Sequence, residues 1–163
     1  MIRKPRLAEV PGIKKLLDAA AQNDDVLPRP LMELYETARD FHVYVEDGLI
    51  AGCCALHIDM ADLAEIRSLV VRDESRGRGV GAGLLDACIA EARQLEIARV
   101  YALTRKGEFF IKHGFREIDK RGLPHKVFND CVRCPMWPDC DEIAVVRDLT
   151  VVGEDRVNAN EGE

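Results

Sequence analysis

The stretch SLVVRDESRGRGVGAGLL, Ser68–Leu85, passes from β-branched residues through a charged turn into glycines. Its turn matches the pattern R-x-x-G-x-G at Arg76, Gly79 and Gly81, between an expected strand and the start of an expected helix. Glycines keep side chains out of such a turn, so successive N–H groups can converge on a pyrophosphate at the positive end of the helix dipole. Arg76 and Arg78 add positive charge. The alternative is an ordinary strand-to-helix turn whose glycines allow tight packing.

Two common nucleotide-binding motifs do not fit this turn. A dinucleotide fingerprint needs G-x-G-x-x-G, but the sixth position is Ala82 counted from Gly77 and Leu84 counted from Gly79. A P-loop needs a lysine directly after its last glycine, and none stands there. An anion-binding turn outside these two classes remains.

Periodic apolar residues and turn signals predict the order of the elements. Asp47 and Gly48 separate two apolar runs, which is a strong hairpin signal. Gly114 follows a short apolar run and predicts a left-handed helix cap. The order of helices, hairpin, strand, glycine turn, long helix and further strands is typical of a mixed α/β (α+β) sheet rather than a doubly wound parallel sheet. The expected helices span 8–22, 31–40, 81–96 and 109–114, and the expected strands span 41–46, 49–58, 64–71, 98–104, 116–119 and 141–149.

Length and composition restrict the class of protein. The chain has 163 residues, of which 47% are hydrophobic, and this suits one domain of ordinary size. A net charge of -6 argues against nucleic-acid partners, which need a basic face. The apolar runs are too short to cross a membrane, and the first 20 residues lack a signal-peptide pattern. We expect a cytoplasmic protein with a small-molecule substrate, a homodimer being an open alternative, and a frayed acidic tail over 151–163.

The glycine turn and its surroundings resemble the GCN5-related N-acetyltransferase (GNAT) family. That family carries [QR]-x-x-G-x-[GA] between its fourth strand and third helix, and the stretch GEFFIKHGF, 107–115, is similar to its late helix ending in GF. The resemblance covers 2–149 and implies a single acetyltransferase domain over 1–150. It also implies a mostly antiparallel sheet, flanked by helices, in which strands Ala64–Val71 and Arg99–Thr104 splay apart.

The resemblance implies acetyl-CoA as co-substrate. Backbone N–H groups of the glycine turn would hold the pyrophosphate, and the pantetheine arm would pair with the preceding strand like another strand. The implied cofactor-binding residues are Leu69, Val70, Val71, Arg76, Gly77, Arg78, Gly79, Val80, Gly81, Ala82 and Phe110.

Several longer stretches resemble the acetyltransferase domain of N-acetylglutamate synthases, the first enzymes of arginine biosynthesis. They include LPRPLMELYE, DLAEIRSLVV and the region from REID to DCDE. A short, free-standing form is implied, since no amino-acid-kinase domain precedes these stretches. Glutamate has two carboxylates, for which arginine forks and lysine charges are suited. The residues carried over for the acceptor are Arg29, Arg67 and Lys126, with Arg105 as a weaker candidate; each could instead be a solvated surface charge.

Acetyl transfer to an amine requires removal of a proton, attack on a thioester and release of a thiolate. Strand periodicity predicts that Glu65, Arg67 and Leu69 share one face. We predict Glu65 as the general base acting through water, and a backbone N–H near Leu69 or Val70 as the donor that polarises the carbonyl. The alternative for Glu65 is a surface residue paired with Arg67.

The position of the family's frequent general acid, a tyrosine four residues before the GF glycine, holds Phe110. Three explanations stay open: the thiolate leaves unprotonated, water or another residue such as Tyr101 donates the proton, or the chain is a non-catalytic acetyl-CoA sensor. A transferase acting on another amine is a further alternative.

The cysteines form two groups. Cys131, Cys134 and Cys140, with His125 upstream, could complete a Cys3His zinc site, but free thiols, a disulfide or a redox switch fit the same spacing, so no metal is assigned. Cys53, Cys54 and Cys88 lie in apolar segments and are expected to be small core residues.

Overall fold

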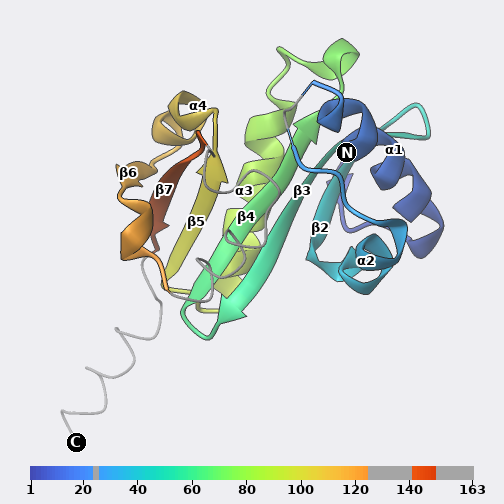
Figure 1. The fold of residues 1–163 in the computed structure, drawn as a ribbon. Helices are drawn as coiled ribbons and strands as arrows, with labels where there is room; N and C mark the ends of the chain where they lie inside the picture. Colours follow the sequence, from blue (N-terminus) through green and yellow to red (C-terminus); the bar gives the residue numbers. More distant parts are fainter. Residues whose placement is uncertain (24–25, 125–140, 150–163) are drawn as a thin grey trace, which may run out of the picture.

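A seven-stranded sheet in the order β1-β2-β3-β4-β5-β7-β6 forms the centre of the molecule (Figure 1). The structure is a computed structural model, and it describes residues 1–23, 26–124 and 141–149. The strands are β1 Ile2–Arg3, β2 Phe41–Glu46, β3 Leu49–Met60, β4 Leu63–Val71, β5 Arg99–Thr104, β6 Arg116–Ile118 and β7 Ile143–Asp148, and the α-helices are α1 Val10–Ala21, α2 Leu31–Glu36, α3 Val80–Gln94 and α4 Gly107–Lys112. The predicted mixed α/β fold is confirmed.

The local signals in the sequence explain where several elements begin and end. Asp47 and Gly48 have φ values of 51° and 75°, which suit the two-residue turn between β2 and β3. Pro11 lies in the first turn of α1, where the missing N–H costs nothing. Gly114 has φ 87° just after α4, as expected for a left-handed cap.

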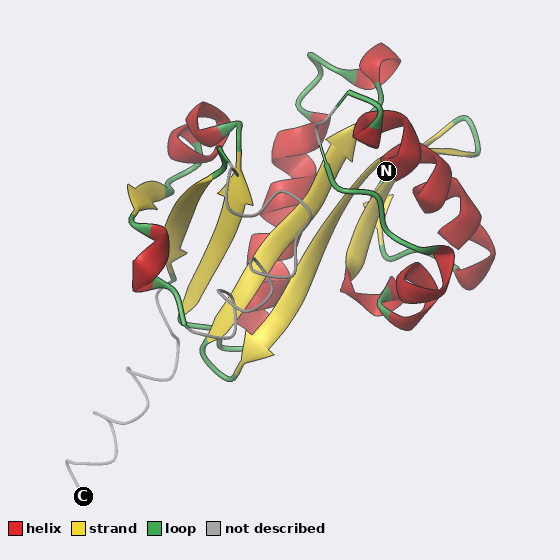
Figure 2. Ribbon diagram, in the orientation of Figure 1, coloured by secondary structure: helices red, strands yellow, loops and turns green. Residues whose placement is uncertain are grey.

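Helices cover both faces of the sheet (Figure 2). Residues of α3, among them Leu84, Leu85 and Ile89, pack on Cys54 and Leu56 of β3. On the opposite face, α1 and α2 pack on Cys53 and Ala55, the alternate residues of the same strand. Cys53, Cys54 and Cys88 are fully buried, so their prediction as small core residues is confirmed.

The sheet divides between β4 and β5, which form its parallel pair. Leu63–Glu65 pair with Arg99–Tyr101, and pairing stops there. All the other neighbouring strands in the described sheet run antiparallel. The two strands diverge beyond this point, as Figure 1 shows, which confirms the predicted splay.

The spatial order of the last strands could not be read from the sequence. The chain passes from β5 to β6 and then returns, so that β7 lies between them and pairs with both. A buried strand needs partners on both edges, and β7 has the apolar residues for that position: Ala144, Val145 and Val146 are each at most 1% exposed.

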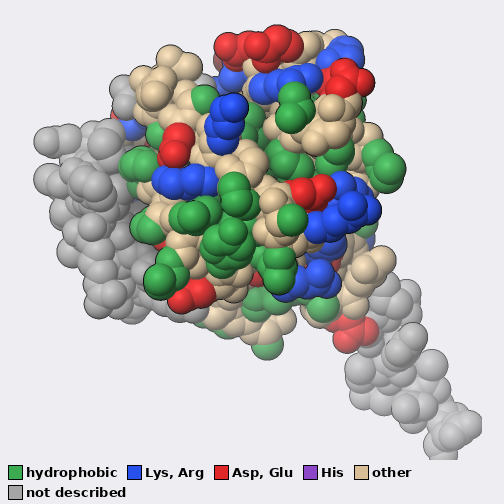
Figure 3. All heavy atoms as spheres, turned by 90° about the vertical axis from the view of Figure 1, so that its right-hand side faces the viewer, with side chains coloured by type: hydrophobic (Ala, Val, Ile, Leu, Met, Phe, Trp, Pro, Cys, Tyr) green, Lys and Arg blue, Asp and Glu red, His purple; other side chains and the backbone are tan. Residues whose placement is uncertain are grey.

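The charge on the visible surface is mixed. On the side seen in Figure 3, which is the right-hand side of Figure 1, basic and acidic side chains lie interspersed around hydrophobic ones. No helix in the described ranges is long and apolar enough to cross a membrane.

Candidate active site

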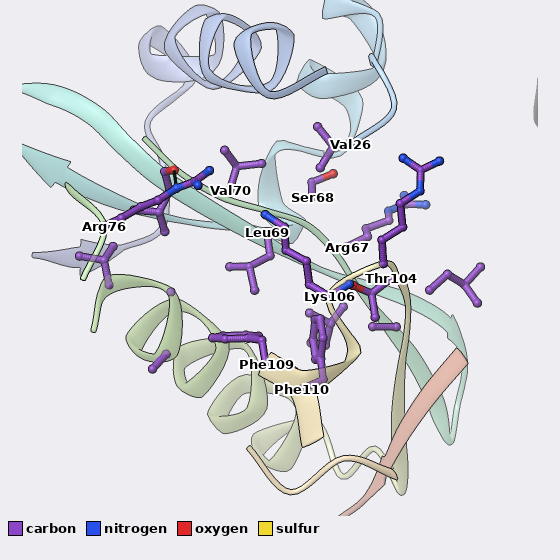
Figure 4. Close-up of a pocket in the computed structure, with 18 of the residues that line it drawn as sticks. Val26, Arg67, Ser68, Leu69, Val70, Arg76, Thr104, Lys106, Phe109 and Phe110 are labelled. Atoms are coloured by element: carbon purple, nitrogen blue, oxygen red, sulfur yellow. Dashed lines mark hydrogen bonds between the residues drawn. The ribbon is translucent and has the colours of Figure 1, made fainter. Parts of the chain in front are cut away.

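A cavity of about 440 Å³ opens where β4 and β5 diverge. Figure 4 shows its wall, with side chains from β4, from the end of β5 and from α4 directed toward a common space. β4 contributes Ile66–Val71, the turn before α3 contributes Ser75–Gly77 and Gly79, and the end of β5 contributes Ala102–Thr104 followed by Arg105 and Lys106. Backbone groups on this edge of β4 are not paired with β5 beyond Glu65. They are therefore placed to bind an extended ligand.

The glycine turn forms one end of the cavity. Gly77 and Gly79 have φ values of 78° and 76°, which L-residues rarely adopt, and Gly79 is the N-cap of the 15-residue helix α3. A Cβ on either glycine would meet no atom within 4 Å, so open space lies over the turn. The N–H groups at the start of α3 and the positive end of its dipole suit an anion there. These residues remain predicted cofactor ligands.

Arg76 and Arg78 lie differently with respect to the cavity. Arg76 lines it, and its Nε donates to the carbonyl oxygen of Val71 at 3.2 Å. The side chain of Arg78 instead forms an ion pair with Glu46, at 2.9 Å. Of the two predicted charges, only the Arg76 side chain lies at the cavity, and Arg78 could contribute through its backbone.

Glu46, at the end of β2, binds the glycine turn through a hydrogen bond and an ion pair. The hydroxyl of Ser75, a fully buried residue, donates to Glu46 Oε2 at 2.6 Å, and Arg72 lies 3.3 Å from the same oxygen. Hydrogen bonds from Ser75 and Arg78 hold the pKa of the Glu46 carboxyl below its usual range. This network fixes the position of the turn relative to the sheet.

A bulge in β4 changes which face its side chains occupy. Ser68 and Leu69 together oppose Cys54 of β3, and Ser68 has φ 56°. Before the bulge, Ala64 and Ile66 face the cluster under α3, whereas after it Leu69 and Val71 do so. The prediction that Leu69 shares a face with Glu65 and Arg67 was therefore wrong, because one extra residue inverts the alternation.

Glu65 and Arg67 do share a face, as predicted. Arg67 Nη1 lies 3.8 Å from Glu65 Oε2. The hydroxyl of Tyr101, on β5, lies 3.4 Å from the same carboxylate oxygen and 2.5 Å from Oδ2 of Asp59, on β3. Arg67 lines the cavity directly, while Glu65 stands next to it at the point where β4 and β5 separate.

Arg29 is buried behind the bulge. The residue is 8% exposed, and its Nη1 donates to Ser68 Oγ at 3.3 Å. Its Nη2 donates to Glu33 and Thr37, and the guanidinium lies over the Phe41 ring, 5.5 Å from the centroid. Arg29 thus reaches the cavity wall through Ser68, the residue that follows Arg67 on β4.

Three cationic side chains line the part of the cavity that is away from the glycine turn. They are Arg67 from β4 and Arg105 and Lys106 from the end of β5, where Arg105 forms an ion pair with Asp141 at 2.6 Å and Glu142 also lines the cavity. Figure 4 shows Lys106 directed from the β5 end across the cavity toward β4. Arg67 Nε is buried and has no hydrogen-bond acceptor among residues 1–23, 26–124 and 141–149. This end of the cavity is suited to a ligand with negative charge.

Known proteins are similar to this chain in sequence and fold. The family model of the acetyltransferase (GNAT) domain matches residues 37–117. The uncharacterized N-acetyltransferase CT2212 of Chlorobaculum tepidum is 36% identical over 148 residues, which cover 91% of this chain and 96% of that protein. The chain belongs to the GNAT acetyltransferase family.

Two further relatives are named more specifically. An amino-acid acetyltransferase of Mycobacterium tuberculosis is 37% identical to this GNAT chain over 136 residues, 82% of this chain and 78% of the relative. The structure of N-acetylglutamate synthase from Neisseria gonorrhoeae, complexed with coenzyme A and N-acetyl-glutamate, matches with a TM-score of 0.84 and 28% identity. That match covers 92% of this chain but only 35% of the synthase chain.

Phe110 gives this GNAT domain an apolar side chain in the cavity wall, at the position where the family frequently has a tyrosine as general acid. Its ring is 5% exposed and packs edge-on against Phe109 and Phe115, with centroids 5.3 Å and 5.1 Å away. Tyr101, the alternative proton donor, is 1% exposed and does not line the cavity. Burial, together with the negative charge of Glu65 and the hydrogen bond to Asp59, raises the pKa of its phenol well above the usual range.

Sequence reasoning missed several residues of the GNAT site. Asp59 and Ser68 were not considered, because their roles depend on pairing between distant strands. Thr104 and Lys106 could have been found, since ligands often bind beyond the carboxyl ends of parallel strands and β5 ends there.

Some predicted site residues lie outside the described residues. Lys126 belongs to this group, as do the candidate zinc ligands His125, Cys131, Cys134 and Cys140. Within the described ranges, no group of three or more His, Cys, Asp or Glu side chains is arranged to hold a metal ion.

Proposed function

We propose that this GNAT domain transfers the acetyl group of acetyl-CoA to the α-amine of L-glutamate. The observation that carries the proposal is the cavity between β4 and β5, which joins a glycine turn at one end to three cationic side chains further along. Such a cavity suits a thioester with a pyrophosphate at one end and a dicarboxylate acceptor at the other.

The cofactor half is built from backbone. We infer that the pyrophosphate binds N–H groups of Gly77–Ala82, and that the pantetheine arm pairs with Leu69–Val71 along the free edge of β4. Support comes from the open space over Gly77 and Gly79 and from the coenzyme A held by the synthase of Neisseria gonorrhoeae. Arg76 would add charge at the cavity wall.

The acceptor half is built from side chains. Arg67 would bind one carboxylate of glutamate through a guanidinium whose Nε lacks an acceptor in the described part of the chain. Lys106 and Arg105 would supply further positive charge, and Arg29 would hold Ser68 at the bulge. The name of the Mycobacterium tuberculosis relative favours an amino acid as acceptor, and the N-acetyl-glutamate in the Neisseria gonorrhoeae structure favours glutamate.

The reaction then needs three events. Glu65 accepts a proton from the ammonium through a water molecule, because its carboxylate lies beside the cavity-lining Arg67 rather than in the wall itself. The free amine attacks the thioester carbonyl, and a backbone N–H of Leu69 or Val70 stabilises the developing oxyanion. Collapse of the intermediate breaks the C–S bond and releases the CoA thiolate, and the extra proton on the new amide nitrogen passes through water to that thiolate.

Release of the thiolate does not require a tyrosine. A thiol of pKa near ~8.5 is a good leaving group compared with an amine, so its anion can depart and take a proton from water. We therefore interpret Phe110 as a packing residue that shapes the cavity around the thioester.

A thiol-release assay with acetyl-CoA tests this function. We expect L-glutamate to give the highest kcat/KM in a panel with L-glutamine, L-aspartate, L-lysine, an aminoglycoside and a peptide with a free N-terminus. A clear preference for another amine would reject glutamate and keep the transferase class. Tight acetyl-CoA binding without turnover on any amine would instead favour a sensor.

The arginine pathway is a separate part of the proposal. Expression of the chain should restore growth of an arginine auxotroph that lacks N-acetylglutamate synthase, and Glu65→Gln should not. Failure of the wild-type chain to restore growth, despite turnover of glutamate in vitro, would place the enzyme outside that pathway.

A further inference from the structure

Tyr101 places one hydroxyl between two carboxylates. The phenol oxygen lies 2.5 Å from Oδ2 of Asp59 and 3.4 Å from Oε2 of Glu65. Both carboxylates are thus within about 6 Å of each other, a range in which like charges disfavour simultaneous ionisation. Tyr101 is 1% exposed, so little water screens this interaction on the phenol side.

We propose that Tyr101 and Asp59 are positioning residues for Glu65, which hold its carboxylate in place and increase its tendency to accept a proton. The inference rests on the proposed role of Glu65 as general base. It adds two residues, on β5 and β3, neither of which lines the cavity.

The proton of the phenol decides how the three groups act. A tyrosine hydroxyl has one proton to donate, and the shorter contact assigns it to Asp59. Burial raises the pKa of the Tyr101 phenol, so the proton stays on its oxygen at neutral pH. Glu65 then faces a phenol oxygen that is already donating elsewhere, and its carboxylate is not stabilised by that hydrogen bond. The negative charge of Asp59, on the other side of the same hydroxyl, disfavours the ionised form of Glu65 and so makes its carboxylate a stronger base.

Other groups that face Glu65 act in both directions. Arg67, two residues along β4, lies 3.8 Å away and favours the charged carboxylate. His57 is paired opposite Glu65 on β3, but its Nδ1 bonds Asp40 at 2.9 Å. From β7, the residue paired with Tyr101 is Val146, which is apolar and fully buried. Asp59 is therefore the negative group that β3 brings to the Tyr101 hydroxyl.

Two substitutions should move the titration of Glu65 in opposite directions. Asp59→Asn removes the neighbouring charge and lets the Tyr101 hydroxyl donate to Glu65, so the midpoint should fall by about one pH unit. Tyr101→Phe leaves the Asp59 charge without its hydrogen bond, so the midpoint should rise. Carbon-detected NMR of 13C-labelled glutamate carboxylates, assigned with Glu65→Gln, measures these midpoints without any turnover. Asp18→Asn, in a surface pair with Lys14, is the matched control and should leave the midpoint unchanged.

Kinetics give a second readout. The acidic limb of the kcat profile should move to lower pH in Asp59→Asn and to higher pH in Tyr101→Phe. The maximal kcat should fall severalfold in both variants, while the KM for acetyl-CoA stays near the wild-type value. A merely structural role would lower the thermal midpoint and both kinetic constants without moving the limb.

The NMR result separates this inference from the proposed function. If Glu65→Gln remains active, Glu65 is not the base, yet opposite shifts of its midpoint would still establish the coupling to Asp59 and Tyr101. Equal midpoints in wild type, Asp59→Asn and Tyr101→Phe would overturn the inference even if Glu65 proves essential.

Discussion

The two ends of the cavity are built by different means. At the glycine turn, the sites for a ligand come from backbone N–H groups of one continuous segment, and Gly77 and Gly79 supply the φ values that segment needs. At the proposed acceptor end, Arg67 and Lys106 line the cavity and Arg29 contacts Ser68 in its wall, and these three residues are far apart in the sequence. The first end can be recognised from a short motif, whereas the second depends on the whole sheet.

This difference also separates the expected effects of substitutions. Changes at the glycine turn should alter acetyl-CoA binding and leave the acceptor untouched. Changes at the other end should alter turnover or acceptor binding and leave acetyl-CoA affinity near the wild-type value. Four experiments test the division, beginning with the largest expected effect.

Glu65→Gln should lower kcat roughly 10²–10⁴-fold, the range typical of a lost general base. Because the amide keeps the size of the side chain, the dissociation constant of acetyl-CoA should not change. Steady-state thiol release and isothermal titration measure the two quantities. Glu117→Gln, on the exposed face of β6, is the control. Equal losses in turnover and in acetyl-CoA affinity would contradict the claim that the two ends of the cavity act separately.

Arg29→Met should lower the free energy of unfolding by about 1.5–3 kcal/mol, the worth of a hydrogen bond to a charged group, and should raise the KM for the acceptor severalfold because Ser68 in the cavity wall loses its partner. The contact with Ser68 links this residue to the bulge. Glu33→Gln keeps the arginine and removes only its exposed ion-pair partner, so it should have a much smaller effect. An Arg29→Met enzyme that is folded, with an altered KM for acetyl-CoA alone, would contradict this assignment.

Gly79→Ala should weaken acetyl-CoA binding about tenfold, since a left-handed conformation costs an alanine ~1–2 kcal/mol. The kcat at saturating acetyl-CoA should stay the same. Gly114→Ala introduces the same strain at φ 87°, just after α4, at a residue that does not line the cavity. It should reduce the free energy of unfolding without changing acetyl-CoA affinity, and equal effects of both variants on affinity would exclude a specific role of the turn.

Glu46→Gln should have the smallest effect, a rise of a few-fold in the dissociation constant of acetyl-CoA. The pKa of Glu46 is lowered in the folded protein by Ser75 and Arg78, so its contribution to stability is present above the ordinary carboxyl pKa. That contribution is lost as the pH falls through the lowered value. Urea unfolding should therefore show a difference between wild type and variant at pH 6 that shrinks below about pH 4. A difference that is constant with pH would mean that the Glu46 charge plays no part.

Most of the fold could be predicted from local signals. The hairpin depends on Asp47 and Gly48, the cap after α4 on Gly114, and the start of α3 on the glycines that also suggested an anion site. Each of these signals acts within a few residues. The position of β7 between β5 and β6 could not be predicted in the same way, because it results from apolar strands competing for partners across the sheet.

The part of the candidate site that backbone N–H groups form was easier to predict than the part that side chains form. Periodicity placed Glu65 beside Arg67 correctly but failed at Leu69, because the bulge at Ser68 has no signal in residue type. Arg78 has the same charge as Arg76, yet Glu46 draws its side chain away from the cavity. Asp59 and Glu65 both contact the Tyr101 hydroxyl, and this contact joins three strands.

The short pairing between β4 and β5 has a geometric consequence. Three residue pairs join a half-sheet of β1–β4 to a half-sheet of β5–β7, and Glu65 with Tyr101 forms the last of them. That pair therefore acts as the pivot about which the halves would rotate. Rotation displaces points in proportion to their distance from the axis, so any widening of the mouth would move Lys106 and the glycine turn far more than the Glu65 carboxylate. The enzyme could admit and release a bulky thioester while its candidate base keeps nearly the same place.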